Sequence, residues 1–374
     1  MMSIIKAAIS SCSEQNCSCQ ATRVPLLPRR VLQISHGSSS ESSKVSVKLY
    51  ESQKNEIAEY VALSYCWGGP QKTITTMENL AAHKIGLAQE FLPQAIQDAI
   101  ALTEYLGYQF LWIDCLCIVQ DDTMDKMIDI NSMGTIYEGA SLTLLAGRSP
   151  SVNQGFLPEW PFPGLSGPMK SNISLPNDGI GSLQVYRIRE PFIEYTRSFN
   201  GPLAKRAWAY QESELSQRSL LFSLDEVVYS CASTSKVIRH PLIQYTPDDP
   251  FEEVIDEIKG KSLRSIVLPM LERDKENELL ATQWLRVVYD YAPLAVTNWE
   301  DRLPALAGVA GKFAAAWGED EYRAGLWERY LVRHLGWKMS GYAKEVLAIP
   351  AWQSPTWSWV RKHSNFLFAI YIIN

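Results

Sequence analysis

The chain has 374 residues, of which 46% are hydrophobic and 11% aromatic, with a formal net charge of -6. This length and composition suffice for a large core in two domains, or in one domain with a sizeable appendage. The negative charge, without a lysine- and arginine-rich stripe, excludes a general nucleic-acid binder. The apolar end at 366–373 is far shorter than the ~20 residues that span a bilayer. The N-terminus is a poor secretion signal, so we expect a cytoplasmic protein without a membrane span.

The seven cysteines are an odd number, which fits a reducing compartment better than a disulfide framework. Cys115 and Cys117 lie in an apolar run, where reduced cysteine usually behaves as a small hydrophobic residue. None of the five histidines has a sequence context that pairs it with a nucleophile, so a Cys-His or Ser-His hydrolase has no support. We expect no metal site and no cofactor.

The first predicted elements lie before residue 107. A serine-rich loop at Ser38–Ser46 overlaps a predicted strand at Val45–Leu49. The run Tyr60–Tyr65 predicts a second strand, which ends at the turn signal Trp-Gly-Gly-Pro. Apolar residues at helical spacing predict a helix over Leu92–Leu106, with a proline in its first turn and Gly107 as its stop.

Asp114 follows the next predicted strand, Phe110–Ile113. Ligand sites of open α/β sheets lie outside the carboxyl ends of the strands, which makes an acid at this position a candidate site residue. The alternative is that Asp114 caps the following segment or pairs with a buried arginine.

A helix over Met124–Tyr137 and a strand over Leu142–Ala146 complete a strand-helix-strand-helix-strand pattern with short links. This pattern is typical of a parallel sheet covered by helices. The predicted fold class is α/β, with a central, mostly parallel sheet flanked by helices. A Gly-rich dinucleotide fingerprint or a phosphate loop does not accompany it.

The rest of the chain adds three features. The proline- and glycine-rich stretch Pro158–Pro176 predicts a connection. Ala207–Leu215 predicts a helix, and Leu220–Phe222 with Val227–Cys231 predict a β-hairpin. The tryptophan-rich remainder predicts an appendage packed on the core. We expect an N-terminal Cys/Ser-rich segment at 1–58, a central domain at 59–231 and the appendage at 232–374.

Several blocks of the sequence are similar to the fungal heterokaryon-incompatibility (HET) domain. They are YVALSYCWGG, LPQAIQDAI, FLWIDCLCIVQDD, MGTIYEGASLTLLA and GPLAKRAWAYQESELSQRSLLF, the last with an Arg-x-Trp-x-x-Gln-Glu core. DRLPALAGVA, YRAGLW and SPTWSW resemble the tail usually found behind that domain. Cys12, Asn16 and Cys19 stand where many relatives carry Cys-x3-His-x2-Cys, and the asparagine in place of histidine argues against a metal.

The resemblance implies a core like that of Toll/interleukin-1 receptor (TIR) domains or flavodoxin, because HET domains are thought to be distant relatives of TIR domains. NAD-cleaving TIR domains carry a glutamate in a Trp-x-x-x-Glu setting, which Trp208 and Glu212 resemble. On a helix, two residues at this spacing lie on the same face. One carboxylate suits the reaction, because nicotinamide leaves as a neutral molecule and an anion stabilises the oxocarbenium-like transition state. The alternative is a capping glutamate, or one paired with Arg206 or Arg218.

The candidate site therefore combines polar residues that would be costly inside a core unless paired or functional. We expect all of them to share one cleft, with Glu212 and Asp114 as the catalytic candidates. The substrate-binding candidates are Ser64, Tyr65, Trp67, Gln120, Arg206 and Trp208. An ion pair between Asp114 and Arg206 would instead make these two residues structural.

Two classes of function follow from the resemblance, and a third stays open. The first is an effector or regulator of programmed cell death in fungal non-self recognition and innate immunity, acting by cleavage of NAD. The second is a non-catalytic adaptor that signals by assembling with protein partners or with itself. The third is an accessory protein of fungal secondary metabolism.

Overall fold

The computed structural model describes twelve segments of the chain. They are residues 2–14, 25–36, 45–157, 169–174, 180–185, 201–223, 227–231, 235–238, 277–318, 320–339, 355–361 and 366–368. The expectations for Asn16 and Cys19, for most of the serine-rich loop and for the first part of the Pro158–Pro176 connection concern positions outside these segments.

One eight-stranded sheet forms the centre of the molecule, in the order β10-β9-β8-β5-β3-β4-β1-β2. Its strands are β1 (Arg30–His36), β2 (Val45–Glu51), β3 (Val61–Ser64), β4 (Phe110–Trp112), β5 (Leu142–Leu145), β8 (Arg218–Phe222), β9 (Val227–Cys231) and β10 (Ser235–Ile238). The four central strands β4, β3, β5 and β8 are parallel, and antiparallel strands extend the sheet at both edges.

The parallel strands follow the order second, first, third, fourth along the chain, which is the flavodoxin-like order. The α/β fold class is confirmed, and so are the three strands predicted over Tyr60–Tyr65, Phe110–Ile113 and Leu142–Ala146, which pair in parallel. The predicted hairpin is also confirmed, as β8 and β9. The N-terminal segment supplies β1 and β2, and β1 joins the sheet beside β4.

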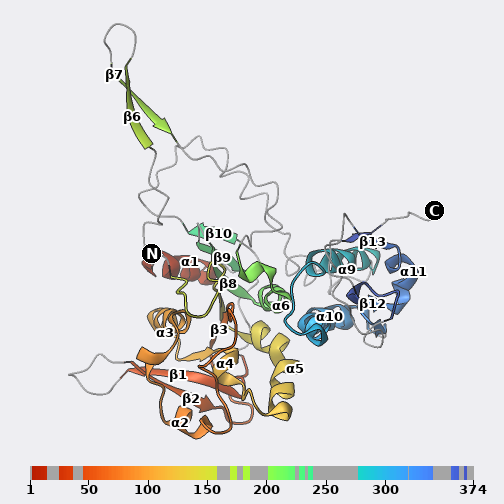
Figure 1. Cartoon of the computed structure of the whole chain (residues 1–374), viewed down its shortest axis with the longest axis horizontal. Helices are drawn as coiled ribbons and strands as arrows, with labels where there is room; N and C mark the ends of the chain where they lie inside the picture. Colours follow the sequence, from red (N-terminus) through yellow and green to blue (C-terminus); the bar gives the residue numbers. More distant parts are fainter. Residues whose placement is uncertain are drawn as a thin grey trace.

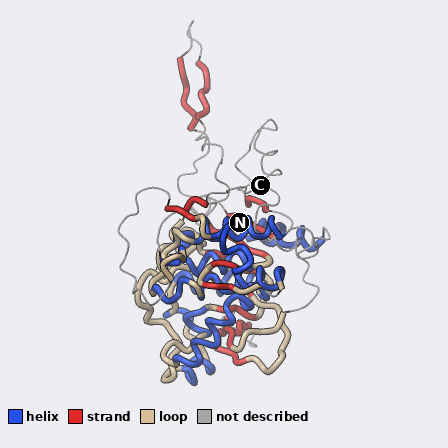
Figure 2. The backbone as a smooth tube through the Cα atoms, turned by 90° about the vertical axis from the view of Figure 1, so that its right-hand side faces the viewer, coloured by secondary structure: helices blue, strands red, loops and turns tan. Residues whose placement is uncertain are grey.

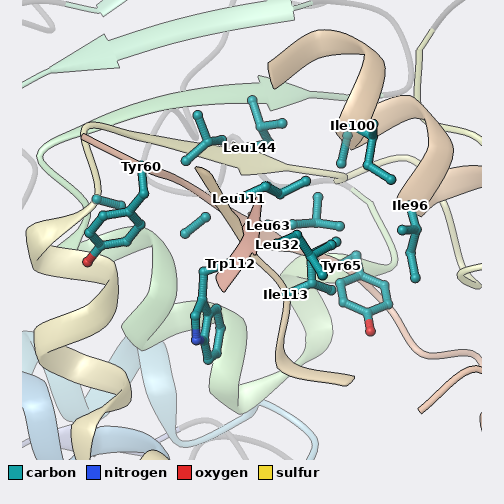
Figure 3. Close-up of a cluster of buried hydrophobic side chains, with 14 of the residues drawn as sticks. Leu32, Tyr60, Leu63, Tyr65, Ile96, Ile100, Leu111, Trp112, Ile113 and Leu144 are labelled. Carbon is teal, nitrogen blue, oxygen red and sulfur yellow. The ribbon is translucent and has the colours of Figure 1, made fainter. Parts of the chain in front are cut away.

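Helices cover both faces of this sheet (Figure 1). α1 (Met2–Glu14) and α3 (Gln94–Leu106) contact each other on one face, and α5 (Thr123–Gly139) contacts α6 (Ala207–Leu215) on the other. The shorter helices are α2 (Leu80–Ile85) and α4 (Asp114–Cys117). α3 buries the apolar stripe that its spacing predicts, and Figure 3 shows Ile96 and Ile100 of that stripe beside the core around β3 and β4.

A buried ion-pair group ties the first strand to α5. Arg30 is 5% exposed and donates from Nε to the carbonyl of Cys117 at 2.7 Å. Its Nη1 donates to Asp125 at 3.1 Å and its Nη2 to Asp129 at 2.7 Å. The Arg30 guanidinium thus has hydrogen-bond acceptors on three residues, as a buried charge requires.

The tryptophan-rich part of the chain forms a C-terminal lobe, drawn in blue in Figure 1, with an aromatic core of its own. Its elements are α9 (Asn277–Tyr291), α10 (Pro304–Trp317), α11 (Leu331–His334), β11 (Tyr322–Arg323), β12 (Leu326–Trp327), β13 (Trp337–Met339) and β14 (Phe366–Phe368). α10 packs on α5 and α6, so the lobe lies on the side of the sheet that these two helices cover. Trp284, Trp327 and Trp359 are fully buried in its core.

The strands β6 (Met169–Ser174) and β7 (Ile180–Val185) pair as an antiparallel hairpin that stands apart from the sheet (Figures 1 and 2). β6 falls within the stretch predicted as an irregular connection, where its sequence MKSNIS carries no clear strand pattern. Gly201, further along the chain, lies so close to Gly147 that a Cβ on Gly201 would overlap the Gly147 carbonyl. Among the described residues, no helix is long and apolar enough to cross a membrane.

Candidate functional site

The candidate residues converge at the carboxyl ends of β3 and β4. Chain order reverses between β3 and β5, which makes this the topological switch point where flavodoxin-like sheets bind ligands. The carboxyl-edge site consists of Ser64, Tyr65, Trp67, Asp114, Arg206 and Glu212.

Asp114 joins the ends of the two strands. Its carboxylate accepts hydrogen bonds from the Tyr65 hydroxyl at 2.9 Å and from Trp67 Nε1 at 2.8 Å. A third bond comes from the backbone N–H of Cys115 at 2.7 Å, but the N-cap of α4 is Ile113, so Asp114 is the first residue of that helix and not its cap. Burial raises the pKa of Asp114, against the opposing effect of these bonds and of the nearby Arg206 charge.

Glu212 projects from α6 into the same edge of the sheet and is 7% exposed. The Ser64 hydroxyl, at the end of β3, donates a hydrogen bond to Glu212 Oε2. Burial raises the pKa of Glu212 from 4.5 to about 7, and the negative charge of Asp114 adds to the rise. The Ser64 bond and the Arg206 charge act in the opposite direction and favour the ionised form.

Arg206 influences both acids through its charge, and the described residues show no direct bond from it to either acid. It directly precedes α6, and its Nη1 donates to the backbone carbonyl of Tyr65. Its charge acts on both Asp114 and Glu212. Within the described part of the chain, Asp114 and Arg206 form no direct ion pair, so the alternative in which they pair is not what the structure contains.

The two remaining candidates, Gln120 and Trp208, form hydrogen bonds that support other parts of the structure. Gln120 donates from Nε2 to the backbone carbonyl of Asp114 at 3.0 Å, which supports the turn after β4. Trp208 donates from Nε1 to Asp301 of the C-terminal lobe at 3.4 Å and packs between the two hydrophobic cores. Gln120 is thus a backbone support of the carboxyl-edge site, whereas Trp208 connects the site to the lobe.

Three residues next to the site, Tyr137, Cys66 and Asp301, were not predicted from the sequence. The Tyr137 hydroxyl donates to the backbone carbonyl of Leu63 at 2.9 Å and also favours the ionised form of Glu212. The Cys66 thiol is buried next to Arg206 and Glu212, and burial raises its pKa. Asp301 belongs to a distant part of the chain. Tyr137 occupies an apolar helix position and Cys66 an apolar run, so neither pattern contained a signal for a polar role.

This arrangement defines the chemistry open to the site. Among the described residues there is no group of three or more side chains that could hold a metal ion. A carboxyl group with a pKa of about 7 can hold or release a proton near neutral pH. When ionised, it can stabilise positive charge that develops on a bound molecule.

Comparison with known proteins gives one result. The model of the family "Heterokaryon incompatibility protein (HET)" matches residues 60–212. No curated protein and no solved structure matches the chain. The matched segment begins one residue before β3 and ends at Glu212, so it includes every residue of the carboxyl-edge site. This chain therefore carries a heterokaryon incompatibility (HET) domain.

Proposed function

We propose that this protein acts in fungal heterokaryon incompatibility as an effector or regulator of cell death, and that its carboxyl-edge site cleaves NAD. The observation that supports this proposal is Glu212, a buried carboxylate at the switch point of the sheet. Its raised pKa means that the ionised form weakens the fold at neutral pH. A side chain that lowers stability yet occupies a ligand-binding position is better explained by function than by packing.

The proposed reaction is hydrolysis of the bond between nicotinamide and ribose. The carbon–nitrogen bond breaks, its electron pair stays on the ring nitrogen, and nicotinamide leaves as a neutral molecule. Water adds to the ribose carbon and releases one proton, which gives ADP-ribose. The Glu212 carboxylate opposes the positive charge of the oxocarbenium-like transition state.

Arg206 and Trp67 are the binding groups in this proposal. The Arg206 guanidinium offers a positive charge for the pyrophosphate of NAD. Trp67 is partly exposed at the same edge and offers an aromatic surface for a ring. Trp67 is held in place by the hydrogen bond that its indole N–H donates to the carboxylate of Asp114.

The test is release of nicotinamide from NAD by the purified protein, followed by chromatography. Glu212→Gln keeps the shape of the side chain and removes its charge, so the rate should fall on the order of 10²–10³-fold. Glu214→Gln, on the same helix but outside the site, is the matched control and should retain the rate. In fungal cells, cell killing and loss of NAD should disappear together in Glu212→Gln and should both persist in Glu214→Gln.

A non-catalytic adaptor is the second candidate, and the closed state of the site favours it. Glu212 is 7% exposed, and both oxygens of Asp114 already accept hydrogen bonds. In this case the protein would signal by assembling with partners or with itself. A wild-type protein that releases no nicotinamide, together with a Glu212→Gln variant that still kills cells, would establish the adaptor and refute NAD cleavage.

A further inference from the structure

The helix α6 carries site residues and lobe contacts next to each other. Glu212 accepts the hydrogen bond from Ser64 of β3. The preceding residue, Gln211, is 1% exposed, and its Oε1 accepts a hydrogen bond from the backbone N–H of Gly308 at 2.5 Å. Gly308 lies in α10 of the C-terminal lobe. Adjacent residues thus fix α6 to the sheet and to the lobe.

The contact at Gly308 leaves no spare room. A Cβ at this position would lie 2.7 Å from Leu215 Cδ1, 2.8 Å from Gln211 Oε1 and 3.0 Å from the Cα of Gly134. These atoms belong to α6 and α5, so three helices meet at one point. Because the Gly134 atom is backbone, an added methyl group must push the helices apart.

The beginning of α6 is tied to the same lobe. The N–H of Ala207 donates to the carbonyl of Ala295 at 2.9 Å, and the N–H of Ala295 donates to the carbonyl of Lys205 at 2.7 Å. Trp208 adds its bond to Asp301. Along its length, α6 is therefore held by the lobe on one side while Glu212 projects toward the sheet on the other.

We propose that Gln211 is a positioning residue, which anchors α6 to Gly308 of the C-terminal lobe and so keeps Glu212 in contact with Ser64. Its importance for catalysis rests on the proposed function, because it acts through the carboxylate to which NAD cleavage is attributed. A further consequence is regulation, since a partner that moves α10 would move Glu212 as well.

The experiment measures the titration of Glu212 itself, which does not require any reaction. In protein with ¹³C-labelled glutamate carboxyl groups, the Glu212 signal is identified by its loss in Glu212→Gln, and its midpoint should be near pH 7. Gln211→Met keeps the volume but removes the acceptor, and Gly308→Ala forces α10 away. In both, water reaches Glu212, and its midpoint should fall toward 4.5.

Two variants complete the set. Gly311 lies on α10, as Gly308 does, but has open space around it. Gly311→Ala is therefore the matched control and should leave the Glu212 midpoint near 7. Gln211→Glu keeps an acceptor for the Gly308 N–H and adds a negative charge near Glu212, so the Glu212 midpoint should be at or above the wild-type value and should not fall. If the protein cleaves NAD, Gln211→Met should lower kcat on the order of 10²-fold with little change in KM.

A folded Gln211→Met protein whose Glu212 titrates as in the wild type would overturn the proposal. Circular dichroism and a cooperative thermal transition establish folding, and if Gly308→Ala fails to fold, Gln211→Met decides alone. Failure of the proposed function is recognised separately. A protein that releases no nicotinamide can still show the shifted titration, which would support the role of Gln211 in placing Glu212.

Discussion

Replacement of Glu212 by Gln should make the protein more stable at neutral and alkaline pH. The pKa of Glu212 rises from 4.5 to about 7 because of burial, so the folded protein keeps a proton that the unfolded chain loses between these values. Stability therefore falls as the pH rises through this window and stays reduced above it. One pKa unit corresponds to about 1.4 kcal/mol, which gives a loss of about 3 kcal/mol above pH 7.

Urea denaturation at pH 5 and pH 8 measures this difference. Relative to the wild type, Glu212→Gln should gain about 2 to 3 kcal/mol in free energy of unfolding between the two pH values. Glu78→Gln, at an exposed position, is the control for a glutamate change on the surface and should follow the wild type. An equal pH dependence in wild type and Glu212→Gln would refute the reasoning, because Glu212 would then be ionised at no cost to the fold.

Two more predictions concern the partners of buried charges. Arg30→Ala removes the buried cation that pairs with the buried Asp129 and the partly buried Asp125, and should cost about 3–5 kcal/mol in free energy of unfolding, measured with urea. Arg29→Ala removes a more exposed partner of the same acids and should cost less than about 1 kcal/mol, so equal losses would contradict this account of the ion pairs. Ser64→Ala removes a bond to the ionised form of Glu212, so the midpoint in the carboxyl titration should rise above about 7, and a fall would be inconsistent with the geometry.

The central part of the fold was accessible from the sequence because its signals are local. Apolar spacing and a glycine stop predicted the helix at Leu92–Leu106, and the structure has α3 over Gln94–Leu106. The strands β3, β4 and β5 follow short apolar runs with clear turn signals. Asp114 was found in the same way, since an acid directly after a buried run marks the edge of a parallel sheet.

What the sequence could not supply are contacts between distant segments. The pairing of β1 with β4 depends on register between two runs about eighty residues apart, which no local pattern encodes. Helical spacing indicated that Trp208 and Glu212 share a face, yet the tryptophan bonds to Asp301 while the glutamate bonds to Ser64. The burial of Glu212 and its raised pKa depend on neighbours far away in the sequence, such as Ser64 and Asp114.

The contact between Gly147 and Gly201 has a consequence for the tolerance of this protein to insertions. Val152 and Phe156, which follow Gly147, are still buried in the core, and the hairpin of β6 and β7 comes later in the sequence, before the chain reaches Gly201. Doubling the length of a flexible loop costs only about 0.6 kcal/mol in closure entropy, because this entropy grows with the logarithm of the loop length. Residues added between β6 and β7 should therefore leave the carboxyl-edge site in place.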